Sequence, residues 1–186
     1  MKTLSCLVLL SLVGVSIPSG AQQSSVWTDP SGRFTLSFAE LGWSGPQQPE
    51  TEDGYILAVE NLELSRGRAV PDVCAVRHAP PARNFPADRI NAMTDGLSES
   101  VLQRFHHTQA PIQNLMRLEI DGVHVVDYVT EMNGAWQHWR TFWLEQSNDA
   151  VMYDVACTGT SPVSSDEMTN MAAVLGSLHF VPARTK

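Results

Sequence analysis

Positively charged residues are few in this chain, and their scarcity argues against one class of function. The 186 residues include 12 lysines and arginines against 20 acidic residues, which gives a formal net charge of −8. Domains that bind nucleic acid need a basic surface to neutralise phosphates, so DNA and RNA are not expected as partners. The same acidic balance disfavours binding to anionic lipid surfaces.

Catalytic and nucleotide-binding motifs are also missing. The sequence contains no Gly-x-Ser-x-Gly elbow, no His-Glu-x-x-His motif, no P-loop and no dinucleotide-binding glycine pattern. It has no internal repeat, no low-complexity tract and no linker that would divide it. At 43% hydrophobic residues it can bury the core of one domain. We therefore expect a single domain that is not an enzyme and holds no cofactor.

The only long apolar run lies near the N-terminus, over residues 4–15. A lysine precedes it, and Pro18 and small residues ending at Ala21 follow it, which is typical of a signal peptide and its cleavage site. An uncleaved anchor is the alternative, but a membrane-spanning helix needs about 20 apolar residues. We expect a signal peptide at 1–21 and one periplasmic or secreted domain at 22–186, with no transmembrane segment after cleavage.

The chain has three cysteines, and Cys6 belongs to the leader. Cys74 and Cys157 remain, and two cysteines in an oxidising compartment can pair without a leftover thiol, so we predict one disulfide. Closing a loop of 83 residues would restrict the unfolded chain by about 4 to 5 kcal/mol in the entropy model. Two buried free thiols or a reactive pair are the alternatives, although no Cys-x-x-Cys motif supports redox chemistry.

Hydrophobic patterns predict an α+β fold. Alternating residues place strands at 33–38, 55–59, 73–77, 114–120 and 151–157, with a hairpin over 123–144 and a short extended end at Phe180 and Val181. A stripe with spacings of three and four residues predicts one helix over 87–105, although Gly96 costs it about 1 kcal/mol relative to alanine. Ser164 and Glu167 form a capping box for a final helix that ends near His179.

The hairpin has the clearest local signal. Asn133-Gly134 favours a two-residue type I′ turn, whose twist matches that of the flanking strands. A two-residue loop then sets the following residues opposite one another: Asp127 and Arg140, Val129 and His138, and Tyr128 and Trp139.

The segment Trp27-Thr-Asp-Pro-Ser-Gly-Arg-Phe34, continuing through Phe38 to Gly42-Trp43, resembles the opening of PsbP-like domains. The order of the expected elements over 26–181 is similar to that of the superfamily. The resemblance implies a central antiparallel sheet, here of about six strands, with two main helices on its faces. It also implies a non-enzymatic role as an extrinsic subunit, an assembly factor or a partner-binding module. The cysteine pair is not part of the family pattern.

One face of the predicted hairpin carries Asp127, His138 and Arg140. A carboxylate, an imidazole and a guanidinium grouped in this way could bind an anion or perform acid–base chemistry. Cross-strand ion pairs are also ordinary structural features of sheets, worth about 0.2 to 1 kcal/mol. Trp139 and Trp143 share a face with Tyr128, where they would either pack in the core or form a recognition surface.

The histidines do not follow a metal-binding pattern. His106 and His107 are adjacent at a predicted helix end, so their side chains diverge and a solvated or capping role is expected. His124 and His138 lie on opposite faces of the hairpin and cannot share an ion. His78 and His179, at the ends of elements, are expected at the surface.

These observations favour an exported, non-enzymatic binding or assembly module that acts on another exported or envelope protein. Its binding face would be the tryptophan-rich hairpin or the loop at 44–54. The alternative is a small hydrolase or ligand-binding protein with a pocket around Asp127, His138 and Arg140.

Overall fold

The structure of the chain is a computed structural model that describes residues 26–38, 42–44, 54–62, 64–68, 71–132 and 134–182. The predicted signal peptide, most of the loop at 44–54 and Asn133 of the hairpin turn lie outside the described residues. Within the described ranges, no helix has both the length and the apolar character needed to cross a membrane.

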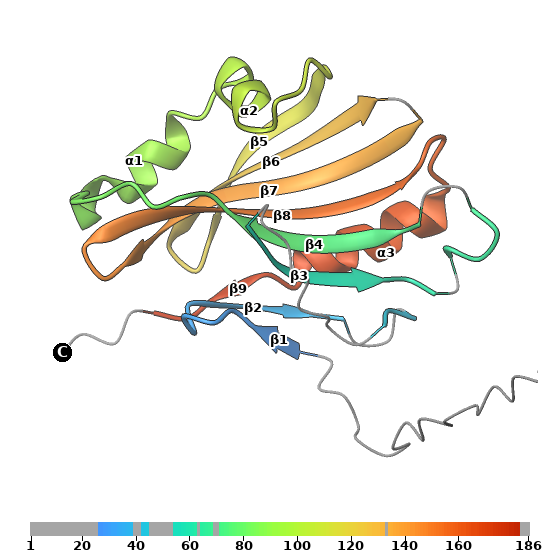
Figure 1. Ribbon diagram of the computed structural model, residues 1–186, viewed down its shortest axis with the longest axis horizontal. Coiled ribbons are helices and arrows are strands. Elements are labelled where there is room, and N and C mark those ends of the chain that lie inside the picture. Colours follow the sequence, from blue (N-terminus) through green and yellow to red (C-terminus); the bar gives the residue numbers. More distant parts are fainter. Residues whose placement is uncertain are drawn as a thin grey trace, which may run out of the picture.

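Six antiparallel strands form the main sheet, in the order β3-β4-β8-β7-β6-β5 (Figure 1). They are β3 (Tyr55–Glu60), β4 (Val73–His78), β5 (Ile112–Ile120), β6 (Val123–Met132), β7 (Ala135–Gln146) and β8 (Asp149–Thr160). The last four form a meander, because short turns return each strand beside its predecessor. The antiparallel sheet expected from the sequence is confirmed.

A second sheet joins the two ends of the described chain, with strands β1 (Val26–Thr28), β2 (Phe34–Ser37) and β9 (His179–Phe180) in the order β1-β2-β9. The carboxylate of Asp29 closes the turn before β2, since its Oδ1 accepts hydrogen bonds from the amides of Arg33 and Phe34. Phe34 is fully buried and packs edge-on against Phe142 and Tyr153 of the main sheet. This segment, which carries the family resemblance, therefore covers part of one face of the main sheet.

Helix α3 (Ser165–Gly176) lies on the same face and contacts β8 and β2. Its predicted capping box is confirmed: the Ser164 hydroxyl accepts from the Glu167 amide at 3.3 Å, and the Glu167 carboxylate accepts from the Ser164 amide at 2.7 Å. The helix ends at Gly176 rather than near His179, because His179 pairs with β2 in the small sheet.

The single helix predicted over 87–105 is wrong. The segment forms a 3₁₀ turn and two short helices: Ala87–Arg89, α1 (Ile90–Asp95) and α2 (Glu99–Phe105). Gly96 ends α1, and Ser98 adopts an extended conformation (φ −101°, ψ 167°) as the residue before α2. The break shifts the phase of the apolar stripe, so Leu102 is fully buried whereas Phe105 is 37% exposed.

The main sheet has a layer on each face (Figure 1). Helix α1 packs on β6 and β7, and α2 contacts β5. The small sheet and α3 cover the opposite face, where they share one hydrophobic cluster with the main sheet. A second cluster lies under α1 and α2 and includes Tyr128, Trp139 and Trp143. Helices on both faces of an antiparallel sheet, as expected, make this an α+β sandwich.

The predicted disulfide is present in the structure. Cys74 of β4 and Cys157 of β8 are direct partners in the sheet register, with their Cα atoms 4.0 Å apart. Both residues are at most 1% exposed, and they face the cluster that α3 covers. The bond therefore joins neighbouring strands at the centre of the sheet and within the core.

Candidate functional site

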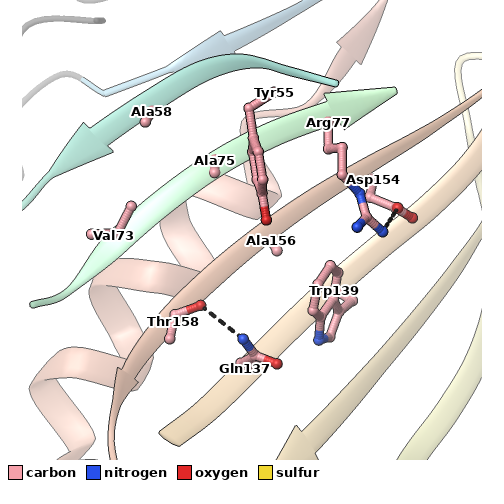
Figure 2. Close-up of a pocket in the computed structure, with 10 residues that line it drawn as sticks. All are labelled: Tyr55, Ala58, Val73, Ala75, Arg77, Gln137, Trp139, Asp154, Ala156 and Thr158. Atoms are coloured by element: carbon pink, nitrogen blue, oxygen red, sulfur yellow. Dashed lines mark hydrogen bonds and ion pairs between the residues drawn. The ribbon is translucent and has the colours of Figure 1, made fainter. Parts of the chain in front are cut away.

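A cavity of about 310 Å³ lies on the α1–α2 side of the sheet, but beside these helices rather than beneath them. Four adjacent strands line it: β3, β4, β8 and β7 (Figure 2). Of the helices in the described part of the chain, none contributes a residue to this lining. The site is thus a stretch of sheet surface that the described residues leave open.

The sheet register arranges the lining in three rows that cross the strands. The middle row consists of Ala58, Ala75, Ala156 and Trp139, each directly opposite the next. One flanking row consists of Tyr55, Arg77 and Asp154, and the other of Val73, Thr158 and Gln137. Neighbouring rows are about 7 Å apart along the strands. We call this feature the trough: a floor of three alanines between two walls of larger side chains.

A β-bulge places Tyr55 in the wall. In a regular strand, residues three apart point to opposite faces, so Tyr55 and Ala58 would not share a side. The register shift between Tyr55 and Leu57 reverses this parity, and Tyr55 lines the same cavity as Ala58. Figure 2 shows the Tyr55 ring extending from β3 across β4 toward Ala156.

Trp139 closes the trough at the end opposite to β3. Its indole Nε1 donates to the Thr130 hydroxyl at 3.1 Å, and its ring packs on the His106 imidazole with the centroids 4.3 Å apart. A second cavity of about 250 Å³ adjoins this end, since it shares Tyr55, Arg77, Gln137 and Trp139 with the first and extends to His106. The indole is therefore held in one orientation between the two cavities.

A closed ring of hydrogen bonds supports the charged wall. Arg77 Nη2 donates to Asp154 Oδ2 at 2.7 Å and to His106 Nδ1 at 2.9 Å. The Thr141 hydroxyl donates to Asp154 Oδ1 at 2.7 Å. Because a hydroxyl has one hydrogen, Thr141 must accept from Tyr128, 3.2 Å away, and Tyr128 must accept from His106 Nε2. One arrangement of hydrogens satisfies all five side chains.

This arrangement requires a neutral His106. A guanidinium only donates, so Nδ1 of His106 carries no hydrogen and Nε2 carries the single one. Burial lowers the pKa of His106, and the neighbouring charges of Arg77 and His107 lower it further, against the opposing effect of Asp154. Burial and the Asp154 charge raise the pKa of Tyr128. At neutral pH the ring therefore contains one cation, one anion and no net charge.

The free energy of unfolding is expected to depend on pH through His106. Its pKa is lower in the folded than in the unfolded chain, where it is about 6.5, so the unfolded chain takes up the proton first as the pH falls. The contribution of neutral His106 is complete above pH 6.5 and is lost as the pH falls from there through the folded pKa. One titrating group can change the free energy of unfolding by at most about 1.4 kcal/mol per pH unit.

Denaturant titrations of the wild type and of His106→Gln between pH 8 and pH 5 measure this effect. The variant should have the shallower slope, because it lacks the titrating group. His78→Gln is the matched control, since His78 is exposed and lies outside the ring. Equal slopes in the wild type and His106→Gln would contradict the assignment of a neutral, buried His106.

The structure places the sequence-predicted cluster on the opposite face of the sheet. The predicted pairing of Asp127 with Arg140 is confirmed, and Asp127 accepts from His138 at 2.8 Å and from Arg140 at 2.9 Å. Arg140 also donates to the carbonyl of Leu175, near the end of α3. Burial would raise the pKa of Asp127, but the two hydrogen-bonded partners lower it below its usual value. The cluster connects the sheet to α3 through the hydrogen bond from Arg140 to Leu175. None of its three side chains lines either cavity of the trough.

The two tryptophans predicted as binding residues lie in different surroundings. Both share a face with Tyr128, as predicted, and both are mostly buried, at 9% and 7% exposure. Trp143 packs in the core close to α1, where its amide lies 3.3 Å from the Thr94 hydroxyl. Trp139 alone among the five predicted binding residues lines the trough.

Sequence reasoning missed Tyr55, Arg77, His106 and Asp154. The solvated role predicted for His106 is wrong, because the ring packs on Trp139 and belongs to the hydrogen-bond network. The predicted position at the helix end is confirmed, since His106 is the C-cap residue of α2. These residues come from four separate elements and follow no recognisable spacing. Within the described residues, no three His, Cys, Asp or Glu side chains come together as a metal site would require.

Comparisons with known proteins bear on the fold alone. No family model and no curated protein matches the sequence. The solved structure of LpqN, described as involved in cell envelope biogenesis of Mycobacterium tuberculosis, is similar with a TM-score of 0.54 and 8% identity, over 80% of this chain and 83% of that one. A structure from Bacteroides thetaiotaomicron gives a TM-score of 0.45 and 10% identity over 88% of this chain. This chain spans 51% of that protein's length.

Proposed function

We propose that this chain is an exported, non-enzymatic binding module of the cell envelope with a PsbP-like fold, and that it holds an apolar ligand in the trough. The observation that carries the proposal is the open, alanine-floored surface beside α1 and α2. A sheet buries apolar surface by covering it with another layer. A concave apolar surface left without cover, and bordered by a few polar groups, is typical of ligand sites.

Two findings support a place in the envelope. The Cys74–Cys157 disulfide fits an oxidising compartment, in agreement with the predicted leader and with a periplasmic or secreted location. LpqN, described as involved in envelope biogenesis in its own organism, has a similar fold. The disulfide and this similarity of fold together support an envelope location for this chain.

The chemistry of the trough favours binding over catalysis. His106 is the nearest candidate for a general base, but its Nδ1 accepts from Arg77 and its Nε2 is bonded to Tyr128. Arg77 is in turn paired with Asp154. A catalytic base needs a free lone pair within reach of a substrate proton. The alternative hydrolase site at Asp127 has the same difficulty, because its carboxylate already accepts hydrogen bonds from His138 and Arg140 on the face that α3 covers.

An exported protein is the partner we propose for delivery or uptake of the ligand. Phe105 is 37% exposed and lies in an open depression of about 410 Å³ with Val101, Arg104 and His107. A large aromatic side chain at the surface beside basic groups is a common feature of protein interfaces. Phe105 and His107, which line the depression, directly flank His106 in the chain, and His106 lines the second cavity of the trough.

The proposed site can be tested with the uncharged fluorescent probe N-phenyl-1-naphthylamine. Ala156→Leu should weaken its binding by roughly tenfold or more, because the added carbons fill the floor next to Trp139 and remove a contact worth about 1.4 kcal/mol or more. Fluorescence titration gives the dissociation constant, and thermal melting shows that the variant is folded.

Ala172→Leu is the matched control, since it makes the same change on the exposed side of α3. This control should bind the probe like the wild type. If folded Ala156→Leu also binds the probe like the wild type, the trough is not the binding site and the proposed function fails.

A further inference from the structure

We infer that the ligand of the trough is a single unbranched hydrocarbon chain, lying across the strands over the alanine row with its end against Trp139 and an uncharged headgroup beyond β3. This inference rests on the proposed binding function and specifies the chemistry of the ligand. It follows from the shape of the trough, the state of its polar groups and its charge.

The shape is long and one residue wide. The floor is a single row that crosses four strands, and adjacent strands are about 4.8 Å apart, so the distance from Ala58 to Trp139 is about 14 Å. The walls stand one row away on each side. Figure 2 shows Tyr55 and Arg77 on one side of the alanine row and Thr158 and Gln137 on the other. A flexible, narrow chain can follow such a space along its whole length.

Four polar side chains of the lining are already bonded in pairs, Arg77 to Asp154 and Gln137 to Thr158, which argues against a peptide as the ligand. Strands β4 and β8 have sheet partners on both sides, so their backbone groups are used within the sheet. Gln137 donates to Thr158 at 3.4 Å, and Arg77 donates to Asp154. A peptide in the trough would bury amides without partners, at a cost of about 1 to 3 kcal/mol for each group. A hydrocarbon chain has no such groups.

Charge argues for an uncharged headgroup outside the trough. Asp154 neutralises Arg77, the only cation of the lining, and the remaining lining residues are uncharged. The trough is closed at Trp139 and reaches the edge strand β3 at Ala58, so a headgroup would lie beyond that edge. Glu60 follows on the same strand, and the whole chain carries a net charge of −8. A carboxylate headgroup would therefore meet repulsion there.

A chain-length series tests this inference on the full-length mature protein. Isothermal titration with alkan-1-ols from hexanol to dodecanol should give a dissociation constant that falls about fourfold for each added methylene, since each buried CH₂ contributes about 0.8 kcal/mol. The dissociation constant should stop falling at the alkanol chain length that fills the trough. In Ala156→Leu the fall should stop at a shorter chain, and in Ala172→Leu at the wild-type length.

Each outcome decides a separate point. Affinity that does not change with chain length, or an unchanged stopping length in Ala156→Leu, would overturn the hydrocarbon-chain assignment. Alkanoates that bind more tightly than alkanols of equal length would overturn the uncharged headgroup. If N-phenyl-1-naphthylamine still binds in a manner sensitive to Ala156→Leu, these failures leave the proposed function intact.

Discussion

The double variant Cys74→Ala/Cys157→Ala is expected to lose about 4 to 5 kcal/mol of unfolding free energy relative to the oxidised wild type. The disulfide closes a loop of 83 residues, and the entropy released to the unfolded chain on its removal corresponds to this amount. Both sulfur atoms lie in the core, so the truncations also remove packing contacts. Urea denaturation at equilibrium, followed by tryptophan fluorescence, measures the difference.

The wild type under strong reductant is the natural control, because it loses the crosslink without losing side-chain volume. It should unfold at a lower urea concentration than the oxidised protein and at a slightly higher one than the double variant, which also lacks the core packing of the two sulfur atoms. Thiol alkylation of the unfolded, unreduced wild type should label neither cysteine. A double variant as stable as the oxidised protein, or two reactive thiols in the unreduced chain, would contradict the structural role of the disulfide.

Asp154→Ala is expected to cost about 3 to 5 kcal/mol, the range seen when one member of a buried ion pair is removed. Asp154 is 2% exposed and accepts from both Arg77 and Thr141. Without it, Arg77 keeps a half-buried charge with no carboxylate partner, and the ring that holds His106 opens. Adding Arg77→Leu should restore part of the loss, because the pair is then replaced by apolar groups.

Asp95→Ala serves as the comparison for an exposed ion pair. Asp95 and its partner His124 have side-chain exposures of 46% and 34%, and such pairs contribute about 0 to 1 kcal/mol. Chemical denaturation of the three variants provides the test. If Asp154→Ala destabilises the protein no more than Asp95→Ala, the hydrogen-bond ring does not support the wall of the trough.

Local patterns predicted several elements correctly. The Asn-Gly turn set the register of β6 and β7, so the pairing of Tyr128 with Trp139 followed from the sequence. The capping box marked the start of α3, because both of its hydrogen bonds lie within four residues. The same kind of reasoning was wrong at Gly96. A continuous apolar stripe can also be satisfied by two short helices, and the tertiary packing of Leu97 and Leu102 chose that solution.

The candidate sites show where local reasoning ends. Asp127, His138 and Arg140 were predicted to meet because one hairpin contains them, and they do. Their structural role depends on α3, which covers their face of the sheet and accepts a hydrogen bond from Arg140. The hairpin sequence alone does not show that helix. The trough depends on pairings between residues far apart in the chain and on a bulge that turns Tyr55. Neither the long-range pairing nor the bulge can be recognised from the residues of one strand.

By itself, the sequence determined the α+β class, the hairpin register, the cysteine pair and the acidic, motif-free character of the chain. Tertiary structure decided which part of the sheet stays open and which polar groups line it. The physical reason is that alternation along a strand tells which residues share a face, whereas the element that covers that face comes from elsewhere in the chain. Ala58, Ala75 and Ala156 are small apolar residues of the kind that a covering helix could equally well pack on. They form the floor of the trough because α1 and α2 pack beside them.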